Sequence, residues 1–396
     1  MAVSLSLPRM IENDGNRRIA FVANTSWSIH NFRREVIRAF LARGFEVHVI
    51  APKDDYSDKL VAQGVVFHEV KLRPYAMSIL ADVLLSIVLW RLYRRHRYDI
   101  VFHYTLKPII YGSLVARLTR TESIAITTGL GRMFAFENYF VGRGVKLLLK
   151  VALHRVRQVW ALNEKDINVL RDSGLVGEDR LHHLPSEGID TNRYRPIRNK
   201  SERGVVRFLF VGRLLWNKGI GAYVNASAKL RSQYGHVQCE VLGFIEERHP
   251  QGVSIHQVEL WQKKGWINYL GNAEDVRPYL DRADCVVLPS WYNEGVSRAL
   301  LEAASMSTSI ITTDQYGCAI TVQHGKTGYI VPKHDQGELL RRMTDLALMD
   351  RLERMAMGQR GREFVRRNYR IEKVIDRYLE LIEEPLQSLP HEIDKS

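Results

Sequence analysis

The chain has 396 residues, more than a single hydrophobic core usually supports, so we expect two domains. Apolar residues make up 45% and charged residues 26% of the sequence, which excludes a disordered or collagen-like chain. The formal net charge of +13 predicts attraction to an anionic partner: nucleic acid, anionic lipid or a phosphorylated substrate.

Cysteine usage and the apolar stretches predict the compartment. Cys239, Cys285 and Cys318 are widely spaced and show no paired metal-ligand spacing, so a reducing, cytoplasmic compartment fits best. The first 18 residues lack the apolar run of a signal peptide. The longest apolar stretch, 76–90, contains Asp82 and is shorter than the roughly 20 residues that span a bilayer. We therefore expect neither secretion nor a transmembrane helix.

Short β-branched runs alternate with helical patterns along the first half of the chain. The expected strands are 18–23, 45–50, 65–70, 99–102, 123–128 and 158–162. Strands separated by helices indicate βαβ units and a parallel sheet. Residues 17–190 are therefore predicted to form a doubly wound, Rossmann-like α/β domain.

A polar segment rich in turn formers, around 185–205, reads as a linker. The alternation then restarts, with strands expected at 205–212, 238–243, 266–271, 284–289, 309–313 and 327–331. Residues 200–370 thus form a second doubly wound domain, and a helix within 371–385 could cross back to the first. The predicted architecture is two tandem domains facing across a cleft.

Ligands of parallel sheets bind at the carboxyl ends of the strands, and two such loops carry suggestive residues. VGRLLWNKGIG, 211–221, places Arg213 and Lys218 beside glycines at a helix start, which suits a diphosphate. A solvated basic turn explains that loop equally well.

The second loop is WYNEGVSRALLEAASM, 291–306. Glu294 and Glu302 can accept hydrogen bonds from sugar hydroxyls. The amides of Gly295, Val296 and Ser297 can meet a phosphate. The alternative is an acid that favours the helix dipole, followed by an exposed Glu302.

Together these motifs resemble the donor site of family 4 retaining glycosyltransferases, which have the two-domain GT-B fold. The resemblance covers residues 17 to about 385 and rests on Arg213, Lys218 and the later Glu-x7-Glu. It implies that the two cations neutralise the donor diphosphate, that Glu302 binds the ribose and that Glu294 touches the transferred sugar. The VLGF loop adds Gly243 to the donor side.

Three motifs of the first half resemble enzymes that extend lipid-linked polysaccharide repeat units: 24–35, 103–114 and 127–134. This narrower resemblance implies an acceptor side. Its expected residues are Asn24, Ser28, Asn31, Arg33, Lys107 and Gly129.

One departure from the family concerns a histidine that contacts the donor sugar. Aligned on Lys107, that position falls on Tyr104, with His103 one residue earlier. Neighbouring residues of an extended chain point oppositely, so either residue could face the ligand, and a lone histidine is more often structural.

The implied mechanism is front-face substitution with retained configuration. It needs no metal and no cofactor besides the nucleotide-sugar, which the resemblance suggests is uridine-linked. Aromatic and basic residues in 132–157, with 90–97, predict peripheral binding to the anionic inner face of the plasma membrane. Sheet-covering helices with a solvated basic side would show the same pattern.

Two other functions are compatible with part of the sequence. A nucleotide-sugar 2-epimerase shares the architecture, but the Arg-x4-Lys and Glu-x7-Glu spacings favour transfer. A nucleic-acid-binding protein would suit the charge, yet the sequence shows no helix-turn-helix, ribonucleoprotein or zinc module, so no nucleic-acid partner is expected.

Overall fold

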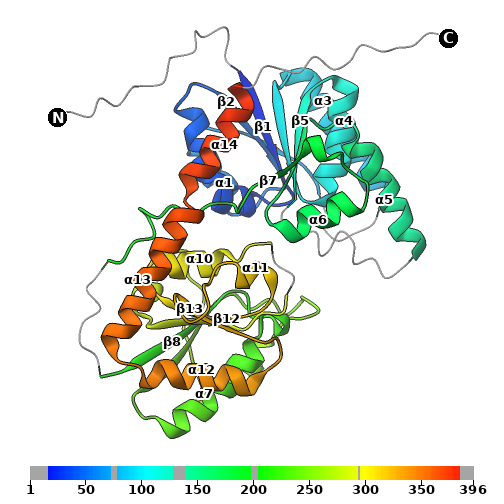
Figure 1. Cartoon of the computed structure of the whole chain (residues 1–396). Coiled ribbons are helices and arrows are strands. Elements are labelled where there is room, and N and C mark those ends of the chain that lie inside the picture. Colours follow the sequence, from blue (N-terminus) through cyan, green and yellow to red (C-terminus); the bar gives the residue numbers. More distant parts are fainter. Residues whose placement is uncertain (1–16, 73–77, 128–138, 198–203, 293–294, 384–396) are drawn as a thin grey trace, which may run out of the picture. The chain divides into compact units, whose positions relative to one another are not determined.

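The computed structural model describes residues 17–72, 78–127, 139–197, 204–292 and 295–383, and it contains two parallel β-sheets, each flanked by helices (Figure 1). By internal contacts the chain divides into two compact units. The first takes in the described residues up to Thr127, with Phe140–Trp160 and Leu175–Arg180. The second takes in Ala161–Gly174 and the described residues from Leu181 onward. The division is therefore more interleaved than the single boundary expected near 190.

The first sheet has seven strands in the order β3-β2-β1-β4-β5-β6-β7. The strands are β1 (Arg18–Val22), β2 (Glu46–Ala51), β3 (Val66–Glu69), β4 (Ile100–Tyr104), β5 (Glu122–Thr127), β6 (Gln158–Ala161) and β7 (Leu181–His183). The helices between them are α1 (Ser26–Leu41), α2 (Ser57–Val61), α3 (Ile79–His96), α4 (Ser113–Thr119), α5 (Tyr139–Leu153) and α6 (Glu164–Asp172). The order follows the doubly wound pattern, in which the chain reverses direction beside β1.

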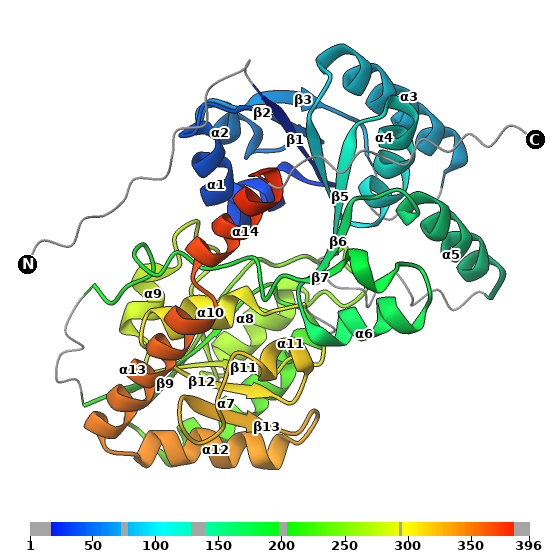
Figure 2. The same ribbon diagram turned by 45° about the horizontal axis from the view of Figure 1, so that its top comes forward.

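Both faces of this sheet are covered, which explains why the central strands β1, β4 and β5 are buried along almost their whole length rather than in alternation. On one face, Leu85, Leu89 and Tyr93 of α3 pack with Val101 of β4 and with α4. On the other, Phe40 of α1 packs against the rings of Phe21 in β1 and Phe102 in β4. Figure 2 shows α3 and α4 on one side of the sheet and α1 on the other.

The second sheet has six strands in the order β10-β9-β8-β11-β12-β13. The strands are β8 (Val206–Val211), β9 (Val237–Leu242), β10 (Asn268–Tyr269), β11 (Cys285–Leu288), β12 (Ser309–Thr313) and β13 (Gly328–Val331). The helices are α7 (Ile220–Gln233), α8 (Ile255–Lys263), α9 (Arg277–Arg282), α10 (Arg298–Ser305), α11 (Tyr316–Ala319), α12 (Gln336–Leu348), α13 (Arg351–Asn368) and α14 (Ile371–Glu383). Its core contains the buried cysteines Cys239, Cys285 and Cys318.

The structure confirms the expected strands, each within a few residues of its predicted bounds. β7 was missed, because its three residues, LHH, contain no β-branched side chain. Helix α14 belongs to the second unit, and its crossing to the first domain stays a prediction. Over the residues that the structure describes, no helix combines the length and apolar character needed to cross a bilayer.

Candidate functional site

The second sheet reverses its winding between β8 and β11, which are neighbours although some seventy residues separate them. From β8 the chain moves outward to β9 on one side and later returns to β11 on the other. Loops at such a switch point part to opposite faces and leave a crevice at the carboxyl ends of the strands. The two loops singled out in the sequence, after β8 and after β11, are the ones that meet there.

Gly219 allows the two loops to touch. Its φ is +82°, a left-handed conformation that glycine adopts without a steric penalty. A β-carbon added to Gly219 would lie 2.1 Å from the carbonyl oxygen of Pro289, well inside van der Waals contact. The glycine after Lys218 is therefore required by the close approach of the β11 loop.

Backbone hydrogen bonds then fix the contact. The carbonyl oxygen of Asn217 accepts from the amides of Trp291 and Tyr292, each at 3.0 Å. The ammonium of Lys218 lies 5.1 Å from the centre of the Tyr292 ring, within cation–π range. Contacts between segments more than 70 residues apart in sequence thus hold Lys218 in one place.

Arg213 lies at the same edge and pairs with a residue that the sequence did not indicate. Its Nη1 is 3.2 Å from Oε2 of Glu246 in the loop after β9. Gly243 brings that loop close, since a β-carbon there would lie 1.8 Å from the carbonyl oxygen of Gly212. Gly243 was predicted to bind donor, and the structure shows it packing backbone against backbone.

One of the three amides predicted to meet a phosphate, at the start of α10, has a partner within the protein. Gly295, Val296 and Ser297 precede the helix, but the Ser297 amide donates to the carbonyl of Gly317 at 2.8 Å. That amide does not point toward a ligand, which corrects the prediction that all three amides do. Over the described residues, the buried Oγ of Ser297 has no hydrogen-bond partner.

Glu302 is not the exposed surface acid that the alternative interpretation assumed. Its Oε1 accepts from Nε of Arg298 at 3.0 Å, and its side chain is 13% exposed. Burial alone would lower the pKa of Arg298, but the Glu302 carboxylate raises it overall. Burial and the same carboxylate raise the pKa of Tyr194. Glu302 therefore belongs to a polar network that includes Arg298, a residue sequence reasoning missed.

Two predicted site residues, Glu294 and Gly129, lie outside the described residues. So do residues 132–138 of the predicted basic and aromatic segment.

The structure does not support His103 as a contact to the donor sugar. The side chain is fully buried, with Nε2 2.8 Å from the hydroxyl of Tyr93 and Nδ1 3.1 Å from Oγ of Ser113. Gly112 is placed so that a β-carbon would collide with the imidazole ring. Burial lowers the pKa of His103 to about 3. The histidine is a neutral part of the packing between β4, α3 and α4.

Tyr104 points to the opposite face and is equally buried. Its ring is nearly parallel to that of Phe21, 6.2 Å away, and the guanidinium of Arg33 lies 4.1 Å from the ring centre. Neither residue at the predicted histidine position therefore faces solvent, and Arg33, predicted for the acceptor side, is held beneath Tyr104.

Thr105, the residue that follows β4, has a backbone conformation that sequence patterns did not predict. It adopts φ +68°, which is strained for a β-branched side chain. A π-helical turn, Pro108–Gly112, follows. Such distortions gather where a backbone must present a group to a ligand. Over the described residues, the Thr105 hydroxyl has no hydrogen-bond partner.

The remaining acceptor-side residues lie near the carboxyl ends of β1 and β4. Ser28 hydrogen-bonds Thr25, the N-cap of α1, and Asn31 donates to the Trp27 carbonyl. Asn24 lies two residues after the end of β1 and is half-buried. Lys107 forms a 2.7 Å ion pair with Asp82 of α3, which gives it a structural partner.

Comparison with protein families covers most of the chain with two models. Residues 18–163 match the family described as glycosyl transferase 4-like, and residues 193–364 match glycosyl transferases group 1. The two matches correspond to the two parallel sheets.

Individual relatives carry matching names. The chain is 27% identical over 335 residues to an N,N'-diacetylbacillosaminyl-diphospho-undecaprenol alpha-1,3-N-acetylgalactosaminyltransferase of Campylobacter jejuni, covering 78% of this chain and 84% of the relative. It is 24% identical to a UDP-Gal:alpha-D-GlcNAc-diphosphoundecaprenol alpha-1,3-galactosyltransferase of Escherichia coli, covering 77% and 81%. These names favour sugar transfer over the epimerase alternative.

Solved structures share the fold. A glycosyltransferase from Rickettsia africae superposes with a TM-score of 0.77 at 17% identity, over 93% of this chain and 98% of that one. A sucrose-phosphate synthase from Thermosynechococcus elongatus gives the same TM-score and identity over 93% and 99%. With both halves matched by family models and the two-sheet architecture shared, the chain belongs to the family 4-like glycosyltransferases of the GT-B fold.

Proposed function

We propose that the protein is a retaining glycosyltransferase that moves a hexose or N-acetylhexosamine from a UDP-sugar to a lipid-diphosphate-linked saccharide during synthesis of a bacterial surface polysaccharide. The observation that carries this proposal is the junction of the loops after β8 and β11, which holds Lys218 against the ring of Tyr292 in the segment that precedes α10. The names of the Campylobacter and Escherichia relatives supply the substrate class.

The cations act on the leaving group. As the bond between C1 of the sugar and the diphosphate oxygen breaks, negative charge develops on that oxygen, and Arg213 and Lys218 stabilise it. The ion pair between Arg213 and Glu246 is about two-fifths exposed on both sides, so it is weak. A diphosphate can therefore displace Glu246 at little cost.

The transfer step balances without a protein nucleophile. The acceptor hydroxyl oxygen bonds to C1 on the face that the diphosphate leaves, and its proton passes to a departing diphosphate oxygen. The products are the glycoside with retained configuration and UDP.

A direct assay tests the proposal. The purified protein is incubated with a panel of UDP-sugars and an undecaprenyl-diphosphate-linked N-acetylhexosamine, and products are identified by mass spectrometry. Proton NMR of the new anomeric centre reports its configuration. Transfer with an α-linkage from an α-linked donor is expected, whereas a β-linkage contradicts retention and release of a free epimerised sugar contradicts transfer.

Metal independence is part of the proposal, because the two cations supply the positive charge that a divalent ion would otherwise provide. Activity is expected to persist in excess chelator. Loss of activity in chelator with recovery on adding magnesium would contradict it.

Glu302 and Glu294 are proposed to act at different stages. Glu302, held by Arg298, binds the ribose, so Glu302→Ala should raise the donor KM more than it lowers kcat. Glu294 is proposed to contact the transferred sugar, so Glu294→Ala should mainly lower kcat. If both variants change only KM, the assignment of Glu294 to the reacting sugar is wrong.

The protein is further proposed to sit on the anionic surface of the membrane that holds its acceptor. Helix α3 buries only a narrow stripe, and its other apolar side chains are exposed. These exposed residues are Ile79, Leu80, Val83, Leu84, Ile87, Val88 and Trp90. An apolar helix face of this extent is a mark of a partner surface rather than of an ordinary solvated helix.

Charge selects lipid as that partner. The C-terminal half of α3 exposes Arg91, Arg94 and Arg95, beside the apolar half. Helix α5 repeats the combination, with Leu147 and Lys150 exposed. Apolar residues that enter a bilayer next to cations that meet anionic headgroups are typical of helices at a membrane surface.

Flotation with vesicles of phosphatidylglycerol and phosphatidylcholine tests this. The wild type is expected to float with anionic vesicles at low salt, and the double variant L80E/L84E is expected to stay at the bottom. Leu352→Glu, an equally exposed leucine on α13, is the matched control. Flotation of both variants, or of neither the wild type nor the control, contradicts the assignment of α3.

A further inference from the structure

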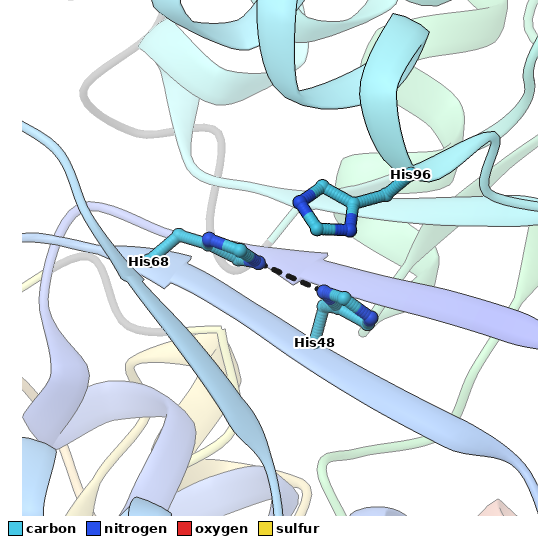
Figure 3. A group of neighbouring side chains, drawn as sticks. All are labelled: His48, His68 and His96. Carbon is cyan, nitrogen blue, oxygen red and sulfur yellow. Dashed lines mark hydrogen bonds between the residues drawn. The ribbon is translucent and has the colours of Figure 1, made fainter.

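Three histidines from separate elements of the first unit meet at one point. His48 lies on β2, His68 on β3 and His96 at the C-terminal end of α3. Figure 3 shows His48 and His68 side by side on neighbouring strands, with His96 reaching over them from the helix. One ring nitrogen from each lies within 4.8 Å of the others.

The parallel pairing of β2 and β3 explains the first two positions. Ile50 is paired with His68, and His48 with Val66, so the two histidines lie two residues apart in register. Side chains two residues apart share a face of the sheet. That face is the one covered by α3, whose last residue is His96.

The hydrogen bonds define where the lone pairs lie. Nε2 of His48 is 2.9 Å from Oε1 of Glu46, so this nitrogen carries the proton and donates to the carboxylate. Nδ1 of His48 is then an acceptor, and it lies 2.8 Å from Nε2 of His68. The hydroxyl of Tyr98 is 3.3 Å from the same Nδ1.

The groups around the cluster keep it uncharged. Burial, with the neighbouring His48 and His96, lowers the pKa of His68 to about 4, and burial also lowers the pKa values of His48 and His96. The cations nearby are Arg18, which is paired with Glu46, and Arg95. Neutral imidazoles are the form in which histidine binds metals.

We propose that His48, His68 and His96 bind a zinc ion. Three imidazoles match the ligand preference of Zn²⁺, with water completing a tetrahedral site. Zinc–nitrogen bonds of about 2.0–2.1 Å place ligand nitrogens roughly 3.3 Å apart, so Nδ1 of His48 and Nε2 of His68 separate slightly while His96 moves inward. His68 then carries its proton on Nδ1.

Glu46 gives the site the outer partner that metal-bound histidines usually have. A carboxylate that accepts from the second nitrogen of a ligand fixes its tautomer and raises its basicity. Glu46 does this for His48 before any metal binds. Since His96 ends α3 just before β4 begins, the site lies away from the carboxyl ends of the strands, and we infer that it takes no part in the sugar transfer.

A metal-free alternative is a hydrogen-bonded pair of histidines with His96 stacked on it. A change at His96 distinguishes this alternative from a metal site. Over the described residues, the His96 side chain forms no hydrogen bond with His48 or His68, only ring contacts at 4.8 Å. The substitution His96→Phe keeps those ring contacts and removes one ligand. It leaves a hydrogen-bonded pair intact but disrupts a metal site.

The experiment uses the full chain, purified without a polyhistidine tag, stripped with chelator and titrated with zinc chloride against a fluorescent zinc chelator. The wild type is expected to bind one zinc per chain, to retain it through dialysis, and to unfold at a higher temperature when loaded. Cobalt substitution should give the visible absorption of a tetrahedral ion. His96→Phe and His68→Gln should each weaken zinc binding at least tenfold.

His154→Phe replaces an exposed histidine of the same unit and should bind zinc like the wild type. Circular dichroism of each variant shows whether it has folded. The proposal is overturned if the wild type holds no stoichiometric zinc, or if folded His96→Phe binds it as tightly as His154→Phe.

Discussion

The two sheets of this enzyme have the same winding but use the carboxyl ends of their strands differently. In the second sheet, the loops after β8 and β11 touch through backbone atoms, because Gly219 lies directly against Pro289. In the first sheet, the corresponding positions at the end of β4 are filled by the buried rings of His103 and Tyr104. The switch point of the second sheet carries two partly exposed cations, Arg213 and Lys218, whereas the end of β4 in the first sheet carries two buried rings. The comparison teaches that a shared topology does not fix where the chemistry lies.

The largest effect is expected from removing the cations of the second unit. Lys218→Ala and Arg213→Ala should each lower kcat/KM by about 10²–10³-fold, as the loss of one transition-state partner typically does, with little change in the free energy of unfolding. Lys264→Ala, which removes an exposed cation resting on Trp266, is the control. Steady-state kinetics with varied UDP-sugar provide the measurement. Near-normal values of kcat/KM in both site variants would contradict the proposal that these cations of the second unit bind the donor diphosphate.

Next in size is the loss of contact between the two loops. Gly219→Ala places a β-carbon 2.1 Å from a carbonyl oxygen at φ +82°, so the free energy of unfolding should fall by about 3 kcal/mol or more, and the donor KM should rise. Gly265→Ala has a similar φ of +70° with nothing within 4 Å, and should cost only about 1–2 kcal/mol. Urea unfolding measures both, and equal costs would mean that the close approach is unimportant.

The first unit should respond in stability rather than in catalysis. His103→Gln removes bonds to Tyr93 and Ser113 and should cost about 1–3 kcal/mol, while kcat stays near the wild-type value. A large fall in kcat with unchanged stability would restore His103 to a catalytic role.

The pH dependence sharpens this test. The pKa of His103 is lowered to about 3 by burial, so its neutral form stabilises the fold fully above the unfolded pKa of about 6.5. That contribution is lost as pH falls toward 3, by at most about 1.4 kcal/mol per pH unit. The His103→Gln variant lacks this imidazole. Its free energy of unfolding should therefore fall less steeply than that of the wild type as the pH is lowered from about 6.5 to about 4. The free energy of unfolding in urea is measured for both proteins across this pH range. An equal pH dependence in the two would contradict the assignment of His103 as a buried, neutral residue.

The smallest effect concerns Glu246. Because its ion pair with Arg213 is half-exposed, Glu246→Gln should tighten UDP binding by at most about fivefold, and the gain should shrink as salt is added. Calorimetric titration with UDP at two ionic strengths measures it. Weaker binding would indicate that Glu246 positions Arg213 rather than competing for it.

Local sequence patterns predicted the strands and the two loops of the second unit, since apolar runs and glycines report directly on burial and backbone conformation. They did not predict which amides stay available, because the Ser297 amide donates to the carbonyl of Gly317 in α11. The sequence left open whether His103 or Tyr104 faces the ligand, and in the structure both are buried. Alternation places them on opposite faces, but both faces of this sheet are covered.

The histidine cluster was beyond sequence reasoning altogether. His48, His68 and His96 show no metal-ligand spacing, and only the pairing of β2 with β3 and the length of α3 bring them together. Arg298 and Glu246 escaped notice likewise, because their roles depend on partners fixed by the fold.

Asp82 interrupts the most apolar stretch of the chain, yet its two oxygens are both engaged. Oδ1 pairs with Lys107 at 2.7 Å and Oδ2 accepts from the Tyr111 hydroxyl at 2.9 Å. Both partners belong to the segment that follows the strained Thr105. An ion pair and a hydrogen bond of Asp82 therefore join α3 to the segment that follows β4. If α3 lies on a bilayer, this carboxylate couples the helix to the segment after β4. The depth and tilt of α3 in the lipid would then set the position of that segment.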